Sequence, residues 1–490
     1  MTRSGWPLGV HRDWLPTHAV PLAAAASRKL SSHMASVHAV PLVTLFLYAW
    51  LIACSHGAPT TGFLTRTGSQ LFANGRPYRF SGANLYWLGL DENEGGVNYP
   101  TPFRVTDGLT TVAGLLPGTT IRAHTIGIST GNPKSFEPAL GVFNHSALGA
   151  ADWAIAEAER LGLRILVPLT DNWRYFHGGK HDFTTWCGSS DENAFYTLPC
   201  AISAFKAYIT ARLTHVNPYT GRAARDEPAV AAWETGNELG SATTAWTCDI
   251  AAFIKSLDPN HLVLDGDLLA SPDTPQHLAQ CTAVDIFQQH FYPPNAAQLE
   301  QQAAQVARAG RVYIAGEYGW TSGSDFPYNA TMQACLSNKN CSGSCAWSFF
   351  PHADTSGFVQ HGDGFTFHYP GDSAPMRAFV AALSAAGAAM AGAGAPPPLP
   401  APLTPAVTAA LGGSLSWRGA ALAASYEVQT APTASGPWQD AGGAPTDNNA
   451  PWAVPGGLPT GAWVRLRGLG EEGLTGPWSS PWLVSGGEGQ

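Results

Sequence analysis

The fold is decided by residues 151–170, which read ADWAIAEAERLGLRILVPLT. Small and apolar side chains recur there at helical spacing, at Ala151, Ala154, Ala158 and Leu161. That periodicity predicts a helix with one apolar face, and Gly162 is a residue type that commonly ends a helix. The apolar run 163–169 follows at once and predicts a strand buried on both faces. The stretch is therefore a helix that returns the chain into a strand, the repeating unit of a parallel sheet.

The same alternation of helical and strand patterns extends from about residue 60 to residue 388. Strand patterns occur at eight places, 79–88, 119–128, 163–169, 229–235, 262–265, 284–289, 312–315 and 346–350. Eight such units predict an α/β protein built on a (β/α)8 TIM barrel. An open, doubly wound sheet is the alternative, but no Gly-rich phosphate loop follows the first strand pattern.

A Pro-, Ala- and Gly-rich stretch divides the chain near its C-terminal end. Residues 385–402 read AAGAAMAGAGAPPPLPAP, a composition typical of a semi-extended linker, which we place at 385–404. Residues 405–490 consist of short strand patterns separated by Gly and Pro, with Trp and Tyr among them. This predicts a small C-terminal all-β sandwich domain that follows a barrel domain at 59–384.

Residues 1–58 precede the barrel pattern and contain one apolar run, 41–54, which reads PLVTLFLYAWLIAC. Small residues follow this run, so it is typical of the core of a signal peptide. It is shorter than the roughly 20 apolar residues that a membrane-spanning helix needs. We therefore expect cleavage, a secreted protein and no stable membrane span. A signal anchor that keeps the protein on the membrane is the alternative.

The composition excludes some partners and favours an oxidising compartment. Charged residues make up only 12% of the chain, the net charge is −9, and no run of Lys or Arg supplies a patch for nucleic acid. Eight cysteines fit an oxidising compartment, and Cys335, Cys341 and Cys345 lie close together. No histidine at zinc-like spacing accompanies them, so we expect disulfides there rather than a metal. We predict no cofactor, and a monomer.

Two carboxylates stand where a barrel enzyme places its reacting groups, just beyond the C-terminal ends of strands. Glu238 follows the fourth strand pattern and Glu317 follows the seventh. Hydrolysis of a glycosidic bond needs one carboxyl group to protonate the leaving oxygen and a second to attack or to activate water. Glu234 could compete with Glu238 for the acid role. Its place inside the strand instead predicts a buried carboxylate bonded to Arg122.

Four motifs occur in order along the chain: Asn237-Glu238, His290-Phe-Tyr292, Gly316-Glu317-Tyr-Gly319 and Trp347. They resemble family 5 of the glycoside hydrolases, and the resemblance covers most of residues 60–370. Within that family the chain is most similar to the endo-β-1,4-mannanases, on Leu169-Thr-Asp-Asn-Trp173, Gly178-Gly179-Lys180 and Trp186. The C-terminal runs SLSW, SYEVQ, GPW, WVRLRG and GPWSS resemble a fibronectin type III module.

The resemblance implies a role for each residue of the site. Glu238 would be the acid/base, Glu317 the nucleophile and Asn237 a donor to the sugar 2-hydroxyl. Arg122 would keep the nucleophile ionised. The remaining substrate-binding residues would be His290, Tyr292, Trp347 and Trp173. A retaining pair would place the two carboxyl groups about 5 to 5.5 Å apart, and we expect Glu238 to stay protonated near neutral pH.

Structural roles compete with these functional ones. Arg122 could be an ordinary salt-bridge residue, and His290 a satisfied polar group of the core. Several tryptophans could belong to the core, although indole stacks well on sugar rings, so we expect one or two of them to line the cleft: Trp87, Trp173, Trp186, Trp246 and Trp320.

We predict a secreted retaining endo-β-1,4-mannanase that hydrolyses mannan-type polysaccharides. Two departures from the mannanase pattern put the substrate in doubt: Leu239 stands where the family usually has proline, and Asp265-Gly-Asp267 replaces a Glu-Gly pair. The alternatives are another family 5 β-glycanase, acting on cellulose or a mixed glucan, and a non-catalytic protein that binds wall glycans. We also expect that removing residues 405–490 leaves hydrolysis of soluble substrate nearly unchanged.

Overall fold

The computed structural model describes residues 59–320 and 329–486. The expected signal peptide or anchor, 1–58, lies outside the described residues. Within the described ranges no helix is both long enough and apolar enough to cross a membrane.

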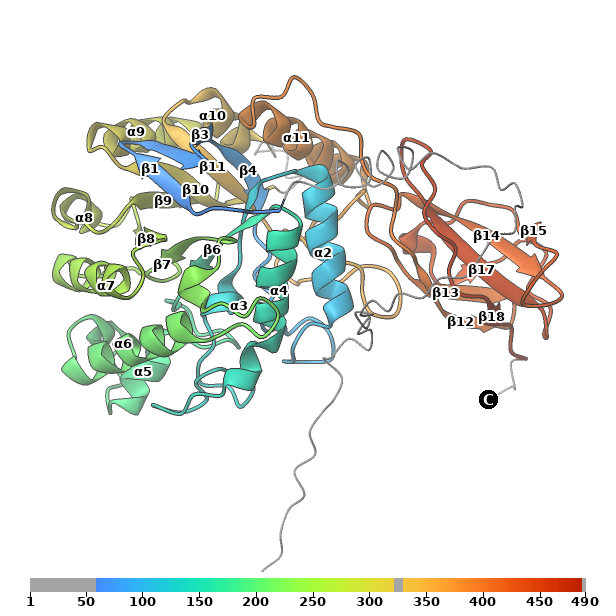
Figure 1. Cartoon of the computed structure of the whole chain (residues 1–490), viewed down its shortest axis with the longest axis horizontal. Helices are drawn as coiled ribbons and strands as arrows, with labels where there is room; N and C mark the ends of the chain where they lie inside the picture. Colours follow the sequence, from blue (N-terminus) through green and yellow to red (C-terminus); the bar gives the residue numbers. More distant parts are fainter. Residues whose placement is uncertain (1–58, 321–328, 487–490) are drawn as a thin grey trace, which may run out of the picture. The chain divides into compact units, whose positions relative to one another are not determined.

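Parallel strands form a barrel, as predicted (Figure 1). The sheet has the order β4-β11-β10-β9-β8-β7-β6-β5, and a parallel bridge between Asn84 and Arg122 joins its two ends. The strands are β4 (Phe80–Ala83), β5 (Thr120–Arg122), β6 (Arg164–Pro168), β7 (Val230–Glu234), β8 (Leu262–Leu268), β9 (Ile286–Phe291), β10 (Val312–Gly319) and β11 (Cys341–Trp347). The doubly wound alternative is excluded because the strand order closes on itself.

Helices lie outside the strands, and one or two of them connect each barrel strand to the next along the chain (Figure 1). They are α2 (Pro102–Leu115), α3 (His124–Gly127), α4 (Gly149–Arg160), α5 (Lys180–Trp186), α6 (Pro199–Thr214), α7 (Thr244–Leu257), α8 (Thr274–Gln280), α9 (Ala296–Arg308), α10 (Ala330–Ser337) and α11 (Ala374–Met390). Helix α4 ends as the sequence predicts. Gly162 has φ +75°, and the Gly162 and Leu163 N–H groups donate to the carbonyls of Glu159 and Ala158.

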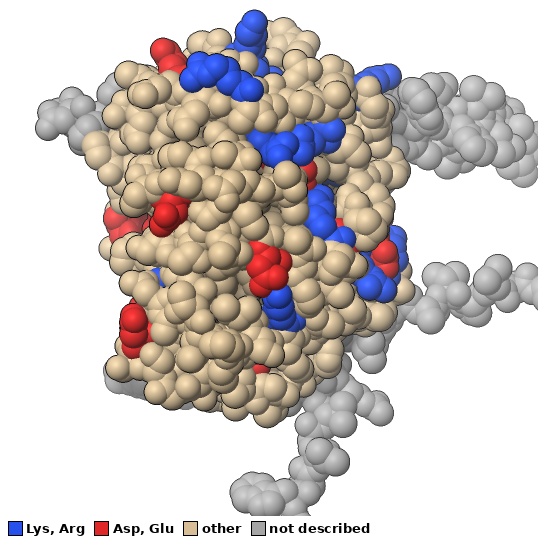
Figure 2. All heavy atoms as spheres, turned by 90° about the vertical axis from the view of Figure 1, so that its left-hand side faces the viewer, with Lys and Arg blue, Asp and Glu red and all other residues tan. Residues whose placement is uncertain are grey.

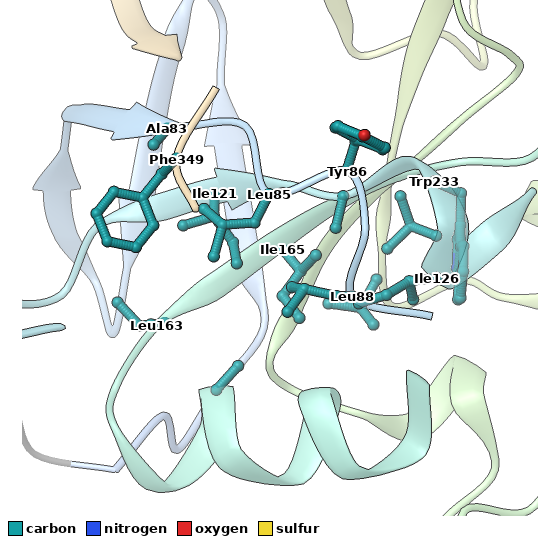
Figure 3. Close-up of a cluster of buried hydrophobic side chains, with 14 of the residues drawn as sticks. Ala83, Leu85, Tyr86, Leu88, Ile121, Ile126, Leu163, Ile165, Trp233 and Phe349 are labelled. Carbon is teal, nitrogen blue, oxygen red and sulfur yellow. The ribbon is translucent and has the colours of Figure 1, made fainter. Parts of the chain in front are cut away.

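The main core lies between the strands and this outer layer of helices. Figure 3 shows part of it, where Ile121 of β5 and Ile165 of β6 lie in one cluster with Leu85, Leu88 and Ile126. These side chains are completely buried, which accounts for the continuous apolar runs in the sequence.

The structure corrects the prediction for the last barrel strand and adds a small sheet. The last strand is β11, Cys341–Trp347, rather than 346–350. Its sequence CSGSCAW has no apolar run, so the hydrophobic pattern did not reveal it. Antiparallel strands β1 (Leu64–Thr67), β2 (Gln70–Ala73) and β3 (Arg76–Tyr78) were not predicted. Leu64 and Leu71 in this sheet pack in one cluster with residues from the barrel strands.

The C-terminal residues form two antiparallel sheets, in agreement with the predicted all-β domain. One sheet has the order β12-β13-β16 and the other β15-β14-β17-β18. The strands are β12 (Ala406–Leu411), β13 (Ser414–Arg418), β14 (Ser425–Ala431), β15 (Gln439–Asp440), β16 (Trp452–Ala453), β17 (Trp463–Leu469) and β18 (Trp482–Leu483). Trp417, Tyr426 and Leu466 are fully buried in the core of this domain, which we call the β-module.

The start of the predicted linker is wrong, because α11 continues through Met390. Ala386 and Ala388 within this stretch are buried. Alanine-rich sequence has a high helix propensity, so the low complexity of residues 385–390 reflects a helix that packs on the barrel rather than a spacer. No helix or strand is assigned to residues 391–405, and Leu399 packs against the barrel core.

Disulfides are present, as predicted, at Cys187–Cys200, Cys248–Cys281 and Cys335–Cys341. Cys345 is the unpaired, buried cysteine of the described residues. Burial raises the pKa of its thiol to about 12. Figure 2 shows that one face of the molecule is mostly uncharged, with basic and acidic side chains interspersed. That face offers no extended basic patch.

Candidate active site

A cleft lies at the C-terminal ends of the barrel strands, and both predicted catalytic residues line it. Other predicted site residues on its wall are Asn237, Tyr292, Trp347 and Trp173. Residues on the wall that were not singled out from the sequence include Tyr86, Glu92, His124, Asp171, Tyr175, Phe176, His177, His361, Asp363 and Phe365. Arg122 and His290 do not line the cleft. Arg122 contacts Glu317, and His290 lies close to both glutamates.

The loop after β7 presents Glu238 to the cleft. Its backbone has φ +52°, a left-handed conformation that costs a glutamate free energy and is held only by its surroundings. The next residue, Leu239, donates its N–H to the carbonyl of Gly266 on β8 at 2.9 Å. A Cβ on Gly266 would lie 2.1 Å from the Gly236 carbonyl oxygen, so the loop and β8 touch backbone to backbone. This contact fixes the direction in which Glu238 points.

Glu317 belongs to β10 and faces Glu238 across a short distance. One carboxylate oxygen from each glutamate and one ring nitrogen of His290 all lie within 4.8 Å of one another. The register of the sheet explains this, since Glu317 is the direct partner of His290 on the neighbouring strand β9. The Glu317 side chain is 7% exposed and that of Glu238 is 21% exposed. Both are therefore accessible to a ligand in the cleft.

Positive and polar groups surround the Glu317 carboxylate. Arg122 Nη1 donates to Oε1 at 2.5 Å, the Tyr292 hydroxyl donates to Oε2 at 3.2 Å, and His124 Nε2 lies 3.3 Å from Oε1. Burial alone would raise the pKa of this carboxyl, but His290, His124 and Arg122 together hold it well below its usual range. Glu317 is therefore ionised.

Arg122 is fixed by a second carboxylate deeper in the barrel. Its Nε and Nη2 each lie 2.8 Å from an oxygen of Glu234, a two-pronged ion pair that is completely buried. This confirms the prediction that Glu234 bonds to Arg122 rather than acting as an acid. Arg122 Nη2 also donates to Asn237 Oδ1 at 2.8 Å. One guanidinium thus joins Glu317 and Asn237 into a single array.

Glu238 accepts two hydrogen bonds at 2.6 Å, from His290 Nδ1 to Oε1 and from Trp173 Nε1 to Oε2. Burial raises the pKa of Glu238, but these donors and the charge of His290 lower it below its ordinary value. The expectation of a protonated Glu238 in the free protein is therefore wrong. That expectation rested only on the repulsion between the two carboxylates. His290 Nδ1 lies between them, 3.5 Å from Glu317 Oε2.

Asp171 organises the Asn237 side of the cleft. Its carboxylate accepts from Asn237 Nδ2 at 3.2 Å and from the backbone N–H of Trp173 at 2.9 Å, and it lies 3.0 Å from His177 Nε2. Neither Asp171 nor His124 was singled out from the sequence. Both follow barrel strands directly, so the rule that located Glu238 would also have found them.

Two tryptophans, Trp347 and Trp173, line the cleft. Trp347 stacks on Tyr86 with ring centroids 5.3 Å apart, and its Nε1 donates to Asp363 at 2.6 Å; the Trp347–Ser348 peptide is cis. Trp173 is 48% exposed at the cleft. Trp87, Trp246 and Trp320 are buried and Trp186 packs against the core. One tryptophan of the five that we considered for core or cleft therefore lines the site.

Glu238, His290 and Glu317 also have the spacing of ligands for a cation. Arg122 already neutralises Glu317 at 2.5 Å and would repel a metal ion there. We therefore assign these atoms to a carboxylate pair rather than to a metal centre.

Comparisons with known proteins place this cleft among glycoside hydrolases. A family model described as GH family 5 beta-mannosidase-like matches residues 61–318. Putative mannan endo-1,4-beta-mannosidase P of Arabidopsis thaliana is 34% identical over 242 residues, covering 46% of this chain and 57% of that protein. Mannan endo-1,4-beta-mannosidase 1 of Oryza sativa subsp. japonica is 27% identical over 321 residues, covering 58% of this chain and 71% of the relative.

The chain spans only 51% to 57% of the length of three Arabidopsis thaliana relatives that it matches, among them putative mannan endo-1,4-beta-mannosidase P. Among solved structures, the endo-1,4-beta-mannanase from Rhizomucor miehei matches with a TM-score of 0.57 at 23% identity, covering 68% of this chain and 100% of that one. At this level of identity the match concerns the fold.

Proposed function

This chain belongs to the β-mannosidase-like members of glycoside hydrolase family 5, and from that premise we propose that it is a retaining endo-β-1,4-mannanase. Glu317 is the nucleophile and Glu238 the acid/base. Arg122, Asn237, His290, Tyr292, Trp347 and Trp173 bind the substrate or hold these two groups. Mannan-type polysaccharide is the substrate class, in line with the printed names of the relatives.

The separation of the two carboxylates carries the proposal. Their nearest oxygens lie within 4.8 Å of one another. Retaining enzymes hold the two carboxyl groups about 5 to 5.5 Å apart, whereas inverting enzymes leave about 6.5 to 9.5 Å so that a water molecule fits between them. The spacing therefore favours direct attack by Glu317 on the anomeric carbon.

The polar contacts supply both steps of the reaction. In the first step Glu317 bonds to the anomeric carbon while the bond to the leaving oxygen breaks, and that oxygen takes a proton from Glu238. Burial raises the pKa of Glu238, so the loss of water when sugar fills the cleft favours the protonated carboxyl group that this step needs. In the second step Glu238 takes a proton from water, which attacks the anomeric carbon and releases Glu317.

The departure at residues 265–267 does not alter the surface that a substrate meets. The Asp265 carboxylate bonds to His277 Nδ1 at 2.9 Å, and Asp267 accepts from the Ser271 hydroxyl at 2.5 Å. Both aspartates are buried and neither lines the cleft. The motif therefore gives no support to a glucan-specific enzyme over a mannanase.

Substrate and mode of action are tested by incubating the purified protein with linear mannan, galactomannan, carboxymethylcellulose and mixed-linkage glucan, and sizing the products. We expect short manno-oligosaccharides from mannan, with the β configuration in the first product formed. Release from the glucans alone would make the protein another family 5 β-glycanase. Binding without turnover on every glycan would make it a non-catalytic wall-glycan-binding protein.

We further propose that the protein is secreted as a monomer and that residues 405–490 are a fibronectin type III-like module. The disulfides suit an oxidising compartment. The order β12-β13-β16 against β15-β14-β17-β18 suits such a sandwich. Mass spectrometry of secreted protein tests the first point: a mature chain that begins near residue 59 is expected, and one that begins at Met1 contradicts it.

A further inference from the structure

The segment between β11 and α11, residues 348–373, touches the cleft with one part and the β-module with another. We call it the β11–α11 loop. On the cleft side it contributes His361, Asp363 and Phe365 to the wall. On the module side His352 and Asp372 bond to residues of the β-module. The loop is therefore the physical connection between the candidate active site and the C-terminal domain.

A buried cluster of charges joins the loop to both domains. His352 Nδ1 lies 3.0 Å from both carboxylate oxygens of Asp107, a residue of α2 in the barrel. Its Nε2 lies 3.2 Å from Oδ2 of Asp447 in the β-module. All three side chains are at most 3% exposed. Burial lowers the pKa of His352, but the two aspartates outweigh this effect and raise it to about 10, so the imidazole is a cation at neutral pH.

The β-module holds Asp447 rigidly through two buried aromatic donors. Trp417 Nε1 donates to Oδ1 at 3.2 Å, and the Tyr426 hydroxyl donates to Oδ2 at 2.9 Å. Both rings belong to the core of the module. A Cβ on Gly419 would lie 2.1 Å from His352 Cδ2, so only glycine allows the module to approach the loop this closely. Asp447 therefore cannot move without disturbing the module's core.

Weaker contacts surround this cluster. Thr408 Oγ1 donates to the carbonyl of Thr355 at 2.9 Å, and Asn448 Nδ2 donates to Asp372 at 3.2 Å. Arg418 lies over the Phe103 ring, 4.1 Å from its centroid. Leu422 of the module packs within the barrel's own core cluster. The loop is thus held along its length, and the module is packed against the barrel rather than suspended from a flexible linker.

At the cleft, the same loop orients two groups that face the sugar. Asp363 accepts from Trp347 Nε1 at 2.6 Å, which fixes the plane of that indole. Phe365 meets Tyr292 edge to face with ring centroids 5.4 Å apart, and Tyr292 in turn donates to Glu317. A shift of the loop would therefore move the stacking platform and a hydrogen-bond donor of the nucleophile, while β10, which carries Glu317, and the segment after β7, which carries Glu238, stay in place.

We propose that Asp447 and His352 are positioning residues, and that the β-module maintains substrate binding by fixing the β11–α11 loop against the cleft. The inference rests on the proposed hydrolase function. It reverses our expectation from the sequence that residues 405–490 are dispensable for hydrolysis of soluble substrate.

The test uses the full chain with Asp447→Asn, which keeps the side-chain shape and removes the charge. Glu427→Gln is the matched control, because Glu427 pairs with Arg467 on the β-module, away from the loop. Kinetics on manno-oligosaccharides and hydrogen exchange of residues 348–372 are compared at a temperature at which near-UV circular dichroism reports native protein. Asp447→Asn is expected to raise KM about tenfold, change kcat less than about threefold and speed exchange in the loop. Glu427→Gln should match the unmodified protein in all three.

Equal KM values and equal loop exchange for the two variants would overturn the proposal, even if Asp447→Asn unfolds at a lower temperature. Should Asp447→Asn fail to fold, Thr408→Val decides, because it removes only the bond to the Thr355 carbonyl. A smaller rise in KM with faster exchange near residue 355 supports the proposal, and no change in either contradicts it. If the unmodified protein hydrolyses no mannan, the proposed function fails, while the exchange measurement still reports whether the module fixes the loop.

Discussion

Two histidines of this chain each lie between two carboxylates, yet their surroundings differ. His352 has an aspartate on each ring nitrogen, with Asp107 at Nδ1 and Asp447 at Nε2. His290 directs one nitrogen, Nδ1, at both glutamates, 2.6 Å from Glu238 and 3.5 Å from Glu317. Its buried Nε2 has no hydrogen-bond partner among the described residues.

The difference separates a group that stabilises from a group that reacts. Around His352 every charged group has a fixed partner and solvent is excluded, so none of these groups is free to bind a ligand. Around His290 both glutamates reach the cleft, so their carboxylates are available to a ligand. Removing a carboxylate should therefore mainly cost turnover at His290 and stability at His352.

Replacing Glu317 with alanine should have the largest effect and affect activity alone. Turnover should fall by at least about 10⁴-fold, because no other group can form the bond to the anomeric carbon. The unfolding temperature should change little, since Arg122 keeps its two bonds to Glu234. Steady-state kinetics and calorimetry check both points, and added azide should restore part of the turnover. A loss of activity below about tenfold would contradict the role of nucleophile.

Replacing Glu238 with alanine should depend on the leaving group. Turnover of mannan should fall about 10³-fold, because its leaving oxygen needs a proton. Aryl mannosides with an activated leaving group should lose far less in the first step. Pre-steady-state release of the aryl group measures that step directly. Equal losses for both kinds of substrate would show that Glu238 is not the acid.

Replacing His352 with glutamine should instead lower the free energy of unfolding, by about 3 kcal/mol at pH 6, because two buried aspartates lose their cation. The folded pKa of about 10 lies above the unfolded value of about 6.5. The stabilisation is therefore fully present below about pH 6.5 and is lost as the pH rises through 10. Urea unfolding of both proteins at pH 6 and pH 9.5 checks this. A difference that grows with pH would contradict it.

Replacing Trp173 with phenylalanine should have the smallest effect. It tests whether a single hydrogen bond near His290 changes activity, whereas a change at His352 affects stability. The change removes the N–H that bonds Glu238 Oε2 and keeps an aromatic ring at the cleft. Loss of that donor raises the pKa of Glu238, so the alkaline limb of kcat/KM should move to higher pH. Activity at the optimum should fall less than about tenfold. An alkaline limb that stays in place would show that this bond does not tune the acid.

The sequence predicted the parts of the fold and site that follow from local patterns. Buried strands such as β6 are continuous apolar runs, and Glu238 and Glu317 were found because they follow such runs. The strand β11 was misplaced because its Cys, Ser and Gly residues carry no hydrophobic signal. A sequence pattern locates a strand or a site residue only where the residues next to it in the sequence form a recognisable hydrophobic pattern.

The remaining features depend on contacts between distant segments. The protonation of Glu238 was predicted wrongly because His290 reaches it from β9, 52 residues further along the chain. Asp363 and Phe365 come to the cleft only because the β11–α11 loop folds back over Trp347. The packing of the β-module requires Asp107 and Asp447, which lie far apart in the sequence, to share one imidazole.

That shared imidazole limits how this chain can exchange parts with other proteins in evolution or in design. A C-terminal module brought in by gene fusion would have to supply an acid where Asp447 stands and a glycine where Gly419 stands. Without them the recipient barrel would carry a buried charge at His352 that only Asp107 neutralises. A chimaera that joins this barrel to another module at the proline-rich segment should therefore also replace His352.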